Sequence, residues 1–174
     1  MKLRLTVICV IFSIFTIHAQ HNSRFGVSLY SDYFSIPLSQ ENLITKSGGV
    51  GASYFLKDKL RFSLGFEERM QINSISKSYL TDHGILLGTG YTFWDDNKGF
   101  NSAEAIFELS NSLKYFSDFI DYSVSIGARM YFLDVCFLGT GLRYAGFKGE
   151  QMQQSNNLSW FWQLGLNLKI GKKQ

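Results

Sequence analysis

Residues 160–170, WFWQLGLNLKI, alternate two kinds of side chain with a period of two. One parity is wholly apolar, and it consists of Trp160, Trp162, Leu164, Leu166, Leu168 and Ile170. A β-strand presents alternate residues to opposite faces, so this segment predicts a strand with one entirely apolar face. At about 3.3 Å per residue and a tilt of about 40°, such a strand rises roughly 25 to 28 Å. That is the height of the apolar band on an outer-membrane barrel.

The same alternation recurs upstream, and it predicts seven further strands at residues 25–30, 50–56, 60–67, 85–93, 105–115, 122–132 and 138–144. The connections after the second, fourth and sixth strands are short. Those after the odd strands are predicted to be longer, at residues 34–47, 71–82, 117–120 and 145–158. Transmembrane barrels have short periplasmic turns and longer external loops. With an even number of strands, both chain ends would then be periplasmic.

Side-chain volume indicates which face of these strands lies inside. The apolar parity is crowded with Phe, Leu, Tyr, Trp and Met, whereas the other parity is rich in Gly and Ser. An eight-stranded barrel has an interior just wide enough for side chains to fill it, so the bulky set fits better outside. An apolar band of that size would aggregate in water. We therefore predict an all-β fold, an eight-stranded antiparallel up-and-down transmembrane β-barrel, over a soluble lipocalin-like barrel.

Residues 101–116 also carry a helical signal. Asn101 to Glu104 resemble a capping box, and Ile106, Leu109, Leu113 and Phe116 have helical spacing. A helix here would break the even strand count and leave an open sheet edge in lipid, where unpaired backbone groups are costly. The strand is therefore the favoured interpretation.

The N-terminus predicts export. Lys2 and Arg4 form a basic start, residues 5–17 an apolar run, and residues 17–19 a plausible cleavage site. An uncleaved anchor would need about 20 apolar residues, and this run is shorter. We therefore predict a signal peptide at residues 1–19 and one barrel domain at residues 20–174. Removing the leader leaves Cys136 as the only cysteine, so no internal disulfide can form.

Charge excludes a nucleic-acid binder. The formal charge is +3, and removing Lys2 and Arg4 leaves 17 minus 2 basic residues against 14 acidic ones, or about +1. The basic residues are scattered rather than clustered, whereas nucleic-acid binding would call for a basic patch. The chain also has no phosphate-binding glycine loop and no cluster with metal-ligand spacing, so we expect no cofactor and no metal. The expected partners are outer-membrane lipids and, during biogenesis, the outer-membrane assembly machinery.

Charged side chains on the inward parity need partners, because burying them unpaired is expensive. The strand directions place Arg61, Glu104, Glu108, Arg129 and Lys169 toward the periplasmic half. They place another five toward the outer half: Asp32, Glu67, Arg69, Lys114 and Arg143. If Tyr115 pairs with Tyr122 across the hairpin, Glu108 falls opposite Arg129, which predicts an ion pair. A solute or proton path is the alternative, but eight strands leave no aqueous channel, which favours a salt-bridged plug.

With its leader, eight alternating strands and closing apolar strand, the chain resembles the small outer-membrane β-barrels of the OmpA and OmpX type, over nearly all of residues 24–170. The resemblance implies the fold, and it implies a location in the outer membrane of a Gram-negative bacterium. The family's usual final aromatic residue is absent, since Ile170 is followed by Gly171, Lys172, Lys173 and Gln174.

Enzymatic members of this architecture act on lipid A, as deacylases with an outward Ser and His or as acyl transferases. His83 has outward parity near the external rim, with Asp82 and Ser78 close in sequence, but the expected His-x-Ser pair is missing. We therefore predict a non-catalytic protein with a plugged lumen and a structural or surface-interaction role. The polar external loops, notably residues 148–157, could bind a surface ligand. A lipid A-modifying enzyme with His83 as base is the alternative, followed by a narrow pore.

Overall fold

The computed structural model describes residues 25–39, 43–56, 59–73, 79–96, 101–113, 120–133, 135–149 and 152–170. Every regular element in these ranges is a strand. The strands are β1 (Phe25–Pro37), β2 (Leu43–Leu56), β3 (Leu60–Asn73), β4 (Tyr79–Asp95), β5 (Asn101–Ser112), β6 (Ile120–Phe132), β7 (Cys136–Gly149) and β8 (Met152–Ile170). No helix among the described residues is long and apolar enough to cross a membrane.

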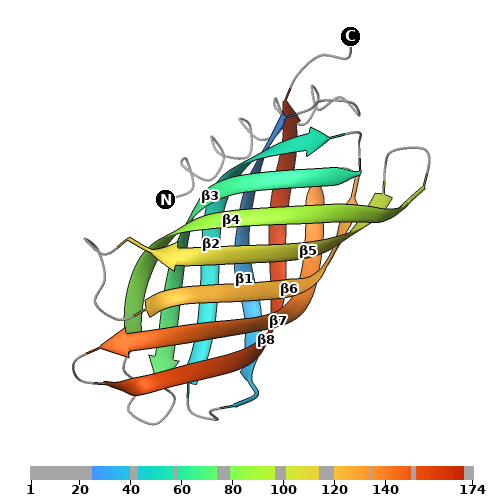
Figure 1. Cartoon of the computed structure of the whole chain (residues 1–174). Helices are drawn as coiled ribbons and strands as arrows, with labels where there is room; N and C mark the ends of the chain where they lie inside the picture. Colours follow the sequence, from blue (N-terminus) through green and yellow to red (C-terminus); the bar gives the residue numbers. More distant parts are fainter. Residues whose placement is uncertain are drawn as a thin grey trace, which may run out of the picture.

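The eight strands form a closed antiparallel barrel in sequence order (Figure 1). Each strand pairs with the next, and β1 closes the ring against β8, with Phe25 opposite Ile170. Closure pairs the backbone groups of both outer strands, so the sheet has no open edge. The predicted eight-stranded up-and-down barrel is confirmed.

The strands are longer than the alternation predicted, and three of the four predicted external loops are too long. The fourth, predicted at residues 117–120, is too short, because β5 ends at Ser112 and residues 113–119 separate it from β6. β1 continues to Pro37 and β2 begins at Leu43, so only residues 38–42 separate them, not residues 34–47. β7 and β8 run to Gly149 and from Met152, within the segment predicted as a loop at residues 145–158. The prediction ended each strand where the alternation of apolar residues ended. The strands continue beyond these points because backbone hydrogen bonding between strands does not require an apolar face.

Residues 101–112 form strand β5, as favoured, and not a helix. The strand pairs with β4 and with β6, placing Leu109 opposite Leu87 on one side and opposite Val124 on the other. Burial alternates along Ala105 to Ser110 with a period of two. Backbone pairing on both sides outweighs the local capping signal, since a helix would leave both neighbouring strands unpaired.

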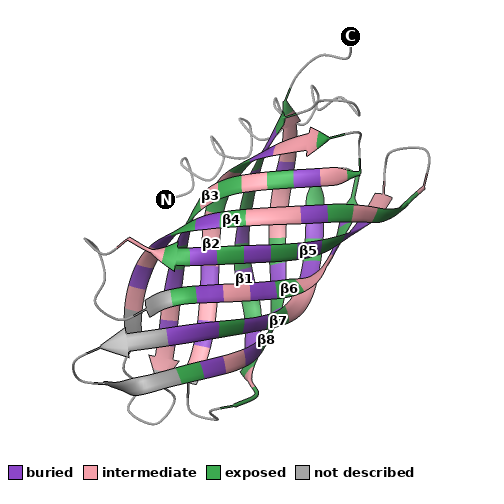
Figure 2. Cartoon of the chain, viewed as in Figure 1, coloured by how far each residue is buried: buried purple, intermediate pink, exposed green. Residues whose placement is uncertain are grey.

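Buried and exposed residues alternate along the strands of the barrel (Figure 2). Outward positions are apolar and exposed, as along β8, where Trp162 is 39% and Leu164 49% exposed. Inward positions between them are buried, including Phe161 and Gln163. The bulky parity therefore faces out and the smaller, polar parity faces the lumen, as predicted.

Two glycine pairs allow close approach of neighbouring backbones. Gly51 pairs with Gly65 between β2 and β3, and Gly127 pairs with Gly141 between β6 and β7. A Cβ on Gly141 would lie 2.3 Å from the carbonyl oxygen of Ile126, which leaves room only for hydrogen. These two interfaces are half a turn of the ring apart. Glycine is therefore required at tight contacts on two opposite sides of the wall.

Candidate functional site

The lumen holds the charged side chains singled out from the sequence. Eight of them are buried: Asp32, Arg61, Glu67, Arg69, Glu104, Glu108, Arg129 and Arg143. Lys169 is half-buried, and Lys114 lies outside the described residues. With Asp82, which is also buried, the described inward positions carry five acidic and five basic groups. Buried charge of both signs at this density is tolerated only when paired and hydrogen-bonded.

One group of lumen residues lies toward the end where β1 begins and β8 ends. Arg61 on β3 reaches Glu104 on β5, with 2.8 Å between Nε and Oε1. The Tyr131 hydroxyl donates to the other Glu104 oxygen at 2.8 Å. A single carboxylate is thus satisfied by side chains from two different strands, so its position ties β3, β5 and β6 together.

Arg129 lies at the centre of this group. Its Nη2 is 2.6 Å from Glu108 Oε1, and its Nε and Nη2 donate to Gln163 Oε1 at 3.0 and 2.8 Å. Its guanidinium carbon lies 4.8 Å from the ring centroid of Phe137 and 5.7 Å from that of Tyr30. Arginine suits this position because its flat, weakly hydrated fork can hydrogen-bond in its plane and stack on aromatic faces.

The predicted Glu108–Arg129 ion pair is confirmed, but the register behind the prediction is wrong. Tyr122 lies opposite Asn111, not Tyr115, and Arg129 lies opposite Glu104. Glu108 itself faces Ser125. The pair forms diagonally along the lumen because the long arginine side chain spans the offset, while Glu104 is bound to Arg61.

A second group lies toward the opposite end. Arg143 on β7 forms an ion pair with Asp32 on β1. The same carboxylate accepts a hydrogen bond of 2.7 Å from the backbone N–H of Ser47. Arg143 also lies 4.6 Å from the ring centroid of Phe161. Since β7 and β1 are separated by β8 around the ring, this pair crosses part of the lumen.

Asp82 completes a third cluster, and the sequence interpretation did not place it in the lumen. Arg69 forms an ion pair with Asp82. The Ser112 hydroxyl donates to Asp82 at 2.7 Å and accepts from Arg69 Nη2 at 2.9 Å. The position of Asp82 could have been predicted from the alternation of the strand, because neighbouring residues point to opposite faces and His83 points outward. Asp82 is therefore not a partner for His83.

Glu67 and Lys169 each contact an aromatic side chain in the lumen. The Tyr30 hydroxyl donates to Glu67 Oε1 at 3.2 Å. The Lys169 ammonium lies 5.7 Å from the Phe55 ring centroid.

Apolar side chains fill the lumen between these polar groups. Tyr30, Leu86, Tyr131 and Phe137 form a buried cluster. Tyr131 and Phe137 contact each other with ring centroids 5.4 Å apart. The inward parity is thus not only Gly and Ser, and its aromatic members occupy space that an open channel would need.

His83 lies on the outward face, as predicted, opposite Glu68 across β3 and β4. Its ring stacks on Phe66, with centroids 5.7 Å apart and an interplanar angle of 19°. The Nδ1 atom has no hydrogen-bond partner among the described residues. Nucleophilic catalysis requires a hydroxyl within hydrogen-bond reach of the base. The described residues supply none to Nδ1, and Ser78 lies outside them.

In the part of the chain that the structure describes, no group of three or more His, Cys, Asp or Glu side chains could hold a metal ion. Cys136 is a free, exposed thiol on the outward face. The predicted ligand-binding segment at residues 148–157 is wrong as a loop, because residues 148–149 belong to β7 and residues 152–157 to β8. Residues 150–151, and residues 40–42, 74–78 and 114–119 of the other external connections, lie outside the described residues.

No protein-family model matches the chain, and no curated protein matches it either. Among solved structures, the chain is similar to the N-terminal β-barrel domain of Pseudomonas aeruginosa OprF. The two share 15% sequence identity with a TM-score of 0.44, over 82% of this chain and 96% of that domain.

Proposed function

We propose that the chain is an integral outer-membrane protein of a Gram-negative bacterium, exported by a cleavable signal peptide at residues 1–19. Its barrel domain, residues 20–174, has a plugged lumen and holds external loops in a structural or surface-interaction role. The single observation that carries the proposal is the belt of exposed apolar side chains around the barrel.

The belt includes side chains from every strand. Among its members, Phe25 and Ile126 are each 61% exposed, Leu64 is 58% exposed and Leu87 is 53% exposed. Soluble monomers rarely expose contiguous apolar patches of more than a few hundred Å². A soluble periplasmic barrel would carry this surface at a high risk of aggregation, whereas acyl chains solvate it. The closed ring of hydrogen bonds meets the other requirement of a lipid environment.

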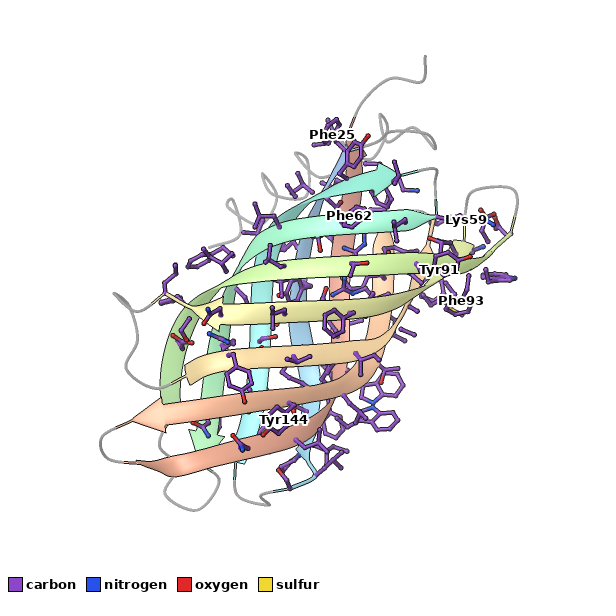
Figure 3. The ribbon with its side chains drawn as sticks, in the orientation of Figure 1. Phe25, Lys59, Phe62, Tyr91, Phe93 and Tyr144 are labelled. Carbon is purple, nitrogen blue, oxygen red and sulfur yellow. The ribbon has the colours of Figure 1, made fainter. Side chains whose placement is uncertain are left out.

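Exposed aromatic side chains lie near both ends of the barrel. Phe25, Tyr91 and Phe93 lie toward one end, and Tyr144 lies toward the other (Figure 3). Aromatic side chains of transmembrane barrels concentrate at the two membrane–water interfaces. This distribution supports a membrane-spanning orientation, with the acyl region between the two sets.

The plug is supported by the three ion-paired clusters and by the aromatic cluster between them. A narrow pore is the competing function, and steady conductance in planar bilayers would favour it. A lipid A-modifying enzyme is not favoured, because Nδ1 of His83 has no hydrogen-bond partner among the described residues. A non-catalytic barrel, in contact with outer-membrane lipids and folded by the assembly machinery, agrees best with this geometry.

Two measurements on the same preparation test the proposal. Outer membranes are washed with carbonate, and the retained protein is run on a gel with and without boiling. An integral closed barrel resists the wash and migrates differently before and after heating, because detergent alone does not unfold it. Release by carbonate, or identical migration in both lanes, would contradict the proposal.

A further inference from the structure

An apolar groove lies on the outward face of strands β1 to β4. Its volume is about 470 Å³, and its outward walls are formed by Phe25, Tyr54, Phe62, Leu64 and Leu87. Ala52, Ser53, Ser63 and Gly88 complete the lining. The surface that these residues expose to the groove is almost entirely apolar.

The groove exists because a small residue interrupts a row of large ones. Ala52 lies opposite Val27 on β1 and Leu64 on β3, and Leu64 in turn lies opposite Leu87 on β4. The next row holds Phe25, Tyr54 and Phe62 side by side. Phe25 and Tyr54 contact each other with ring centroids 5.2 Å apart, so the two rings together form one wall of the groove.

The position of the groove favours a lipid as its occupant. It lies on the apolar belt, toward the end of the barrel at which β1 begins and β8 ends (Figure 3). If the barrel spans the outer membrane as proposed, this end faces the periplasm, where the leaflet is made of phospholipid. Water would leave the apolar lining poorly solvated, whereas an acyl chain would contact it throughout.

Charge complementarity selects a phosphate-bearing headgroup. Lys59 is exposed at the turn before β3, three residues before Phe62, which is about 10 Å along a strand. A lysine at a membrane interface can extend its ammonium to the headgroup level while its stem stays on the apolar surface. A phospholipid whose acyl chain lies in the groove would thus place its phosphate at the level of Lys59.

We propose that this groove binds one glycerophospholipid of the periplasmic leaflet, with an acyl chain over Ala52 and the phosphate at Lys59. The inference rests on the proposed membrane location and adds a lipid class and a site to it. Ala52 provides the space, the Phe25–Tyr54 pair and Phe62 provide the walls, and Lys59 provides the charge.

Native mass spectrometry of the folded full-length protein, titrated with phosphatidylglycerol, tests the proposal. Ala52→Phe fills the groove, and Ala128→Phe is the matched control, because Ala128 is also an outward alanine but lies on β6, away from the groove. Ala52→Phe is expected to weaken phosphatidylglycerol retention about tenfold, since most of the apolar contact is lost. Ala128→Phe is expected to leave it unchanged.

Lys59→Gln tests the headgroup separately. It is expected to weaken phosphatidylglycerol retention about threefold or more, since one charge-assisted contact is lost, while retention of uncharged diacylglycerol stays the same. Equal retention by Ala52→Phe and Ala128→Phe would overturn the proposal. So would a dimer of the wild-type chain that only Ala52→Phe abolishes, because the occupant would then be a second copy.

The two proposals can fail separately. Heat-dependent migration and carbonate resistance are recorded for each variant and for the wild type. A heat-modifiable, carbonate-resistant barrel without a lipid preference at the groove overturns only the groove proposal. A wild-type protein that carbonate releases from the membrane overturns both.

Discussion

Arg129 lies 2.6 Å from Glu108 in the lumen, although its cross-strand neighbour is Glu104. The ion pair therefore joins residues at two different heights along the barrel axis, not two residues that lie directly opposite each other on neighbouring strands. Gln163 and the rings of Phe137 and Tyr30 contact the same guanidinium. Arg129 thus connects β5, β6 and β8 with the aromatic cluster.

Arg129→Met should strongly destabilise the barrel. Methionine keeps much of the volume but leaves Glu108 buried without its cation, a loss of about 3–5 kcal/mol in the free energy of unfolding. Urea titration of the barrel folded into lipid vesicles, followed by tryptophan fluorescence, measures it.

The double variant Arg129→Met with Glu108→Gln provides the control. Removing both charges should recover a large part of the loss, because no unpaired charge then stays in the lumen. If the single and double variants are equally unstable, the ion pair is not what Arg129 contributes.

Gly141→Ala should destabilise the barrel more than Gly139→Ala does. The new Cβ at position 141 would meet the backbone oxygen of Ile126 at 2.3 Å, and only movement of a strand could relieve that contact. At position 139 the nearest atom is a side-chain carbon of Arg129 at 3.1 Å. We expect a loss of about 1–3 kcal/mol for Gly141→Ala and clearly less for Gly139→Ala in the same urea titration. Equal losses would mean that the Gly127–Gly141 contact is not tight.

Leu164→Arg distinguishes a lipid-facing belt from a water-facing one. Leu164 lies in the middle of the apolar parity of β8 and is 49% exposed. In lipid, arginine near mid-depth should cost about 2–4 kcal/mol, whereas Leu38→Arg, just beyond the end of β1, should cost about 0–1 kcal/mol. The comparison uses refolding yields and urea midpoints in vesicles. A soluble barrel would show no loss, or a gain in solubility, for both variants.

His83→Ala should leave lipid A unchanged. The imidazole stacks on Phe66, and its Nδ1 has no hydrogen-bond partner among the described residues. Mass spectrometry of lipid A from cells expressing the wild type, His83→Ala or no barrel should give three identical acylation patterns. A pattern that changes with the wild type but not with His83→Ala would establish catalysis.

The fold was predictable because period-two alternation survives in every strand. The apolar parity of β8 alone indicated both a strand and its outward face, and parity alone located most of the inward charges. Strand ends were less predictable, since backbone pairing extends past the apolar positions, as at Pro37 and Met152.

The register between β5 and β6 could not be read from the sequence. It was predicted by pairing Tyr115 with Tyr122, whereas Asn111 holds that position. The connecting segment includes residues outside the described ranges, and several registers preserve the same inward and outward parity. The Glu108–Arg129 ion pair forms in spite of the different register, because the long arginine side chain spans the distance between the two levels. The groove at Ala52 could not be predicted from the sequence, because it depends on which large residues of neighbouring strands surround this small one.

In the proposed location, the exposed apolar side chains of the barrel contact acyl chains. Spin labels at positions 160, 164 and 170, one at a time in a chain whose two cysteines are replaced, test it directly. In vesicles, collision with oxygen relative to a water-soluble nickel complex should be highest at position 164 and fall toward positions 160 and 170. A label at position 164 that collides with the nickel complex as often as labels at positions 160 and 170 would show that this face of the barrel contacts water.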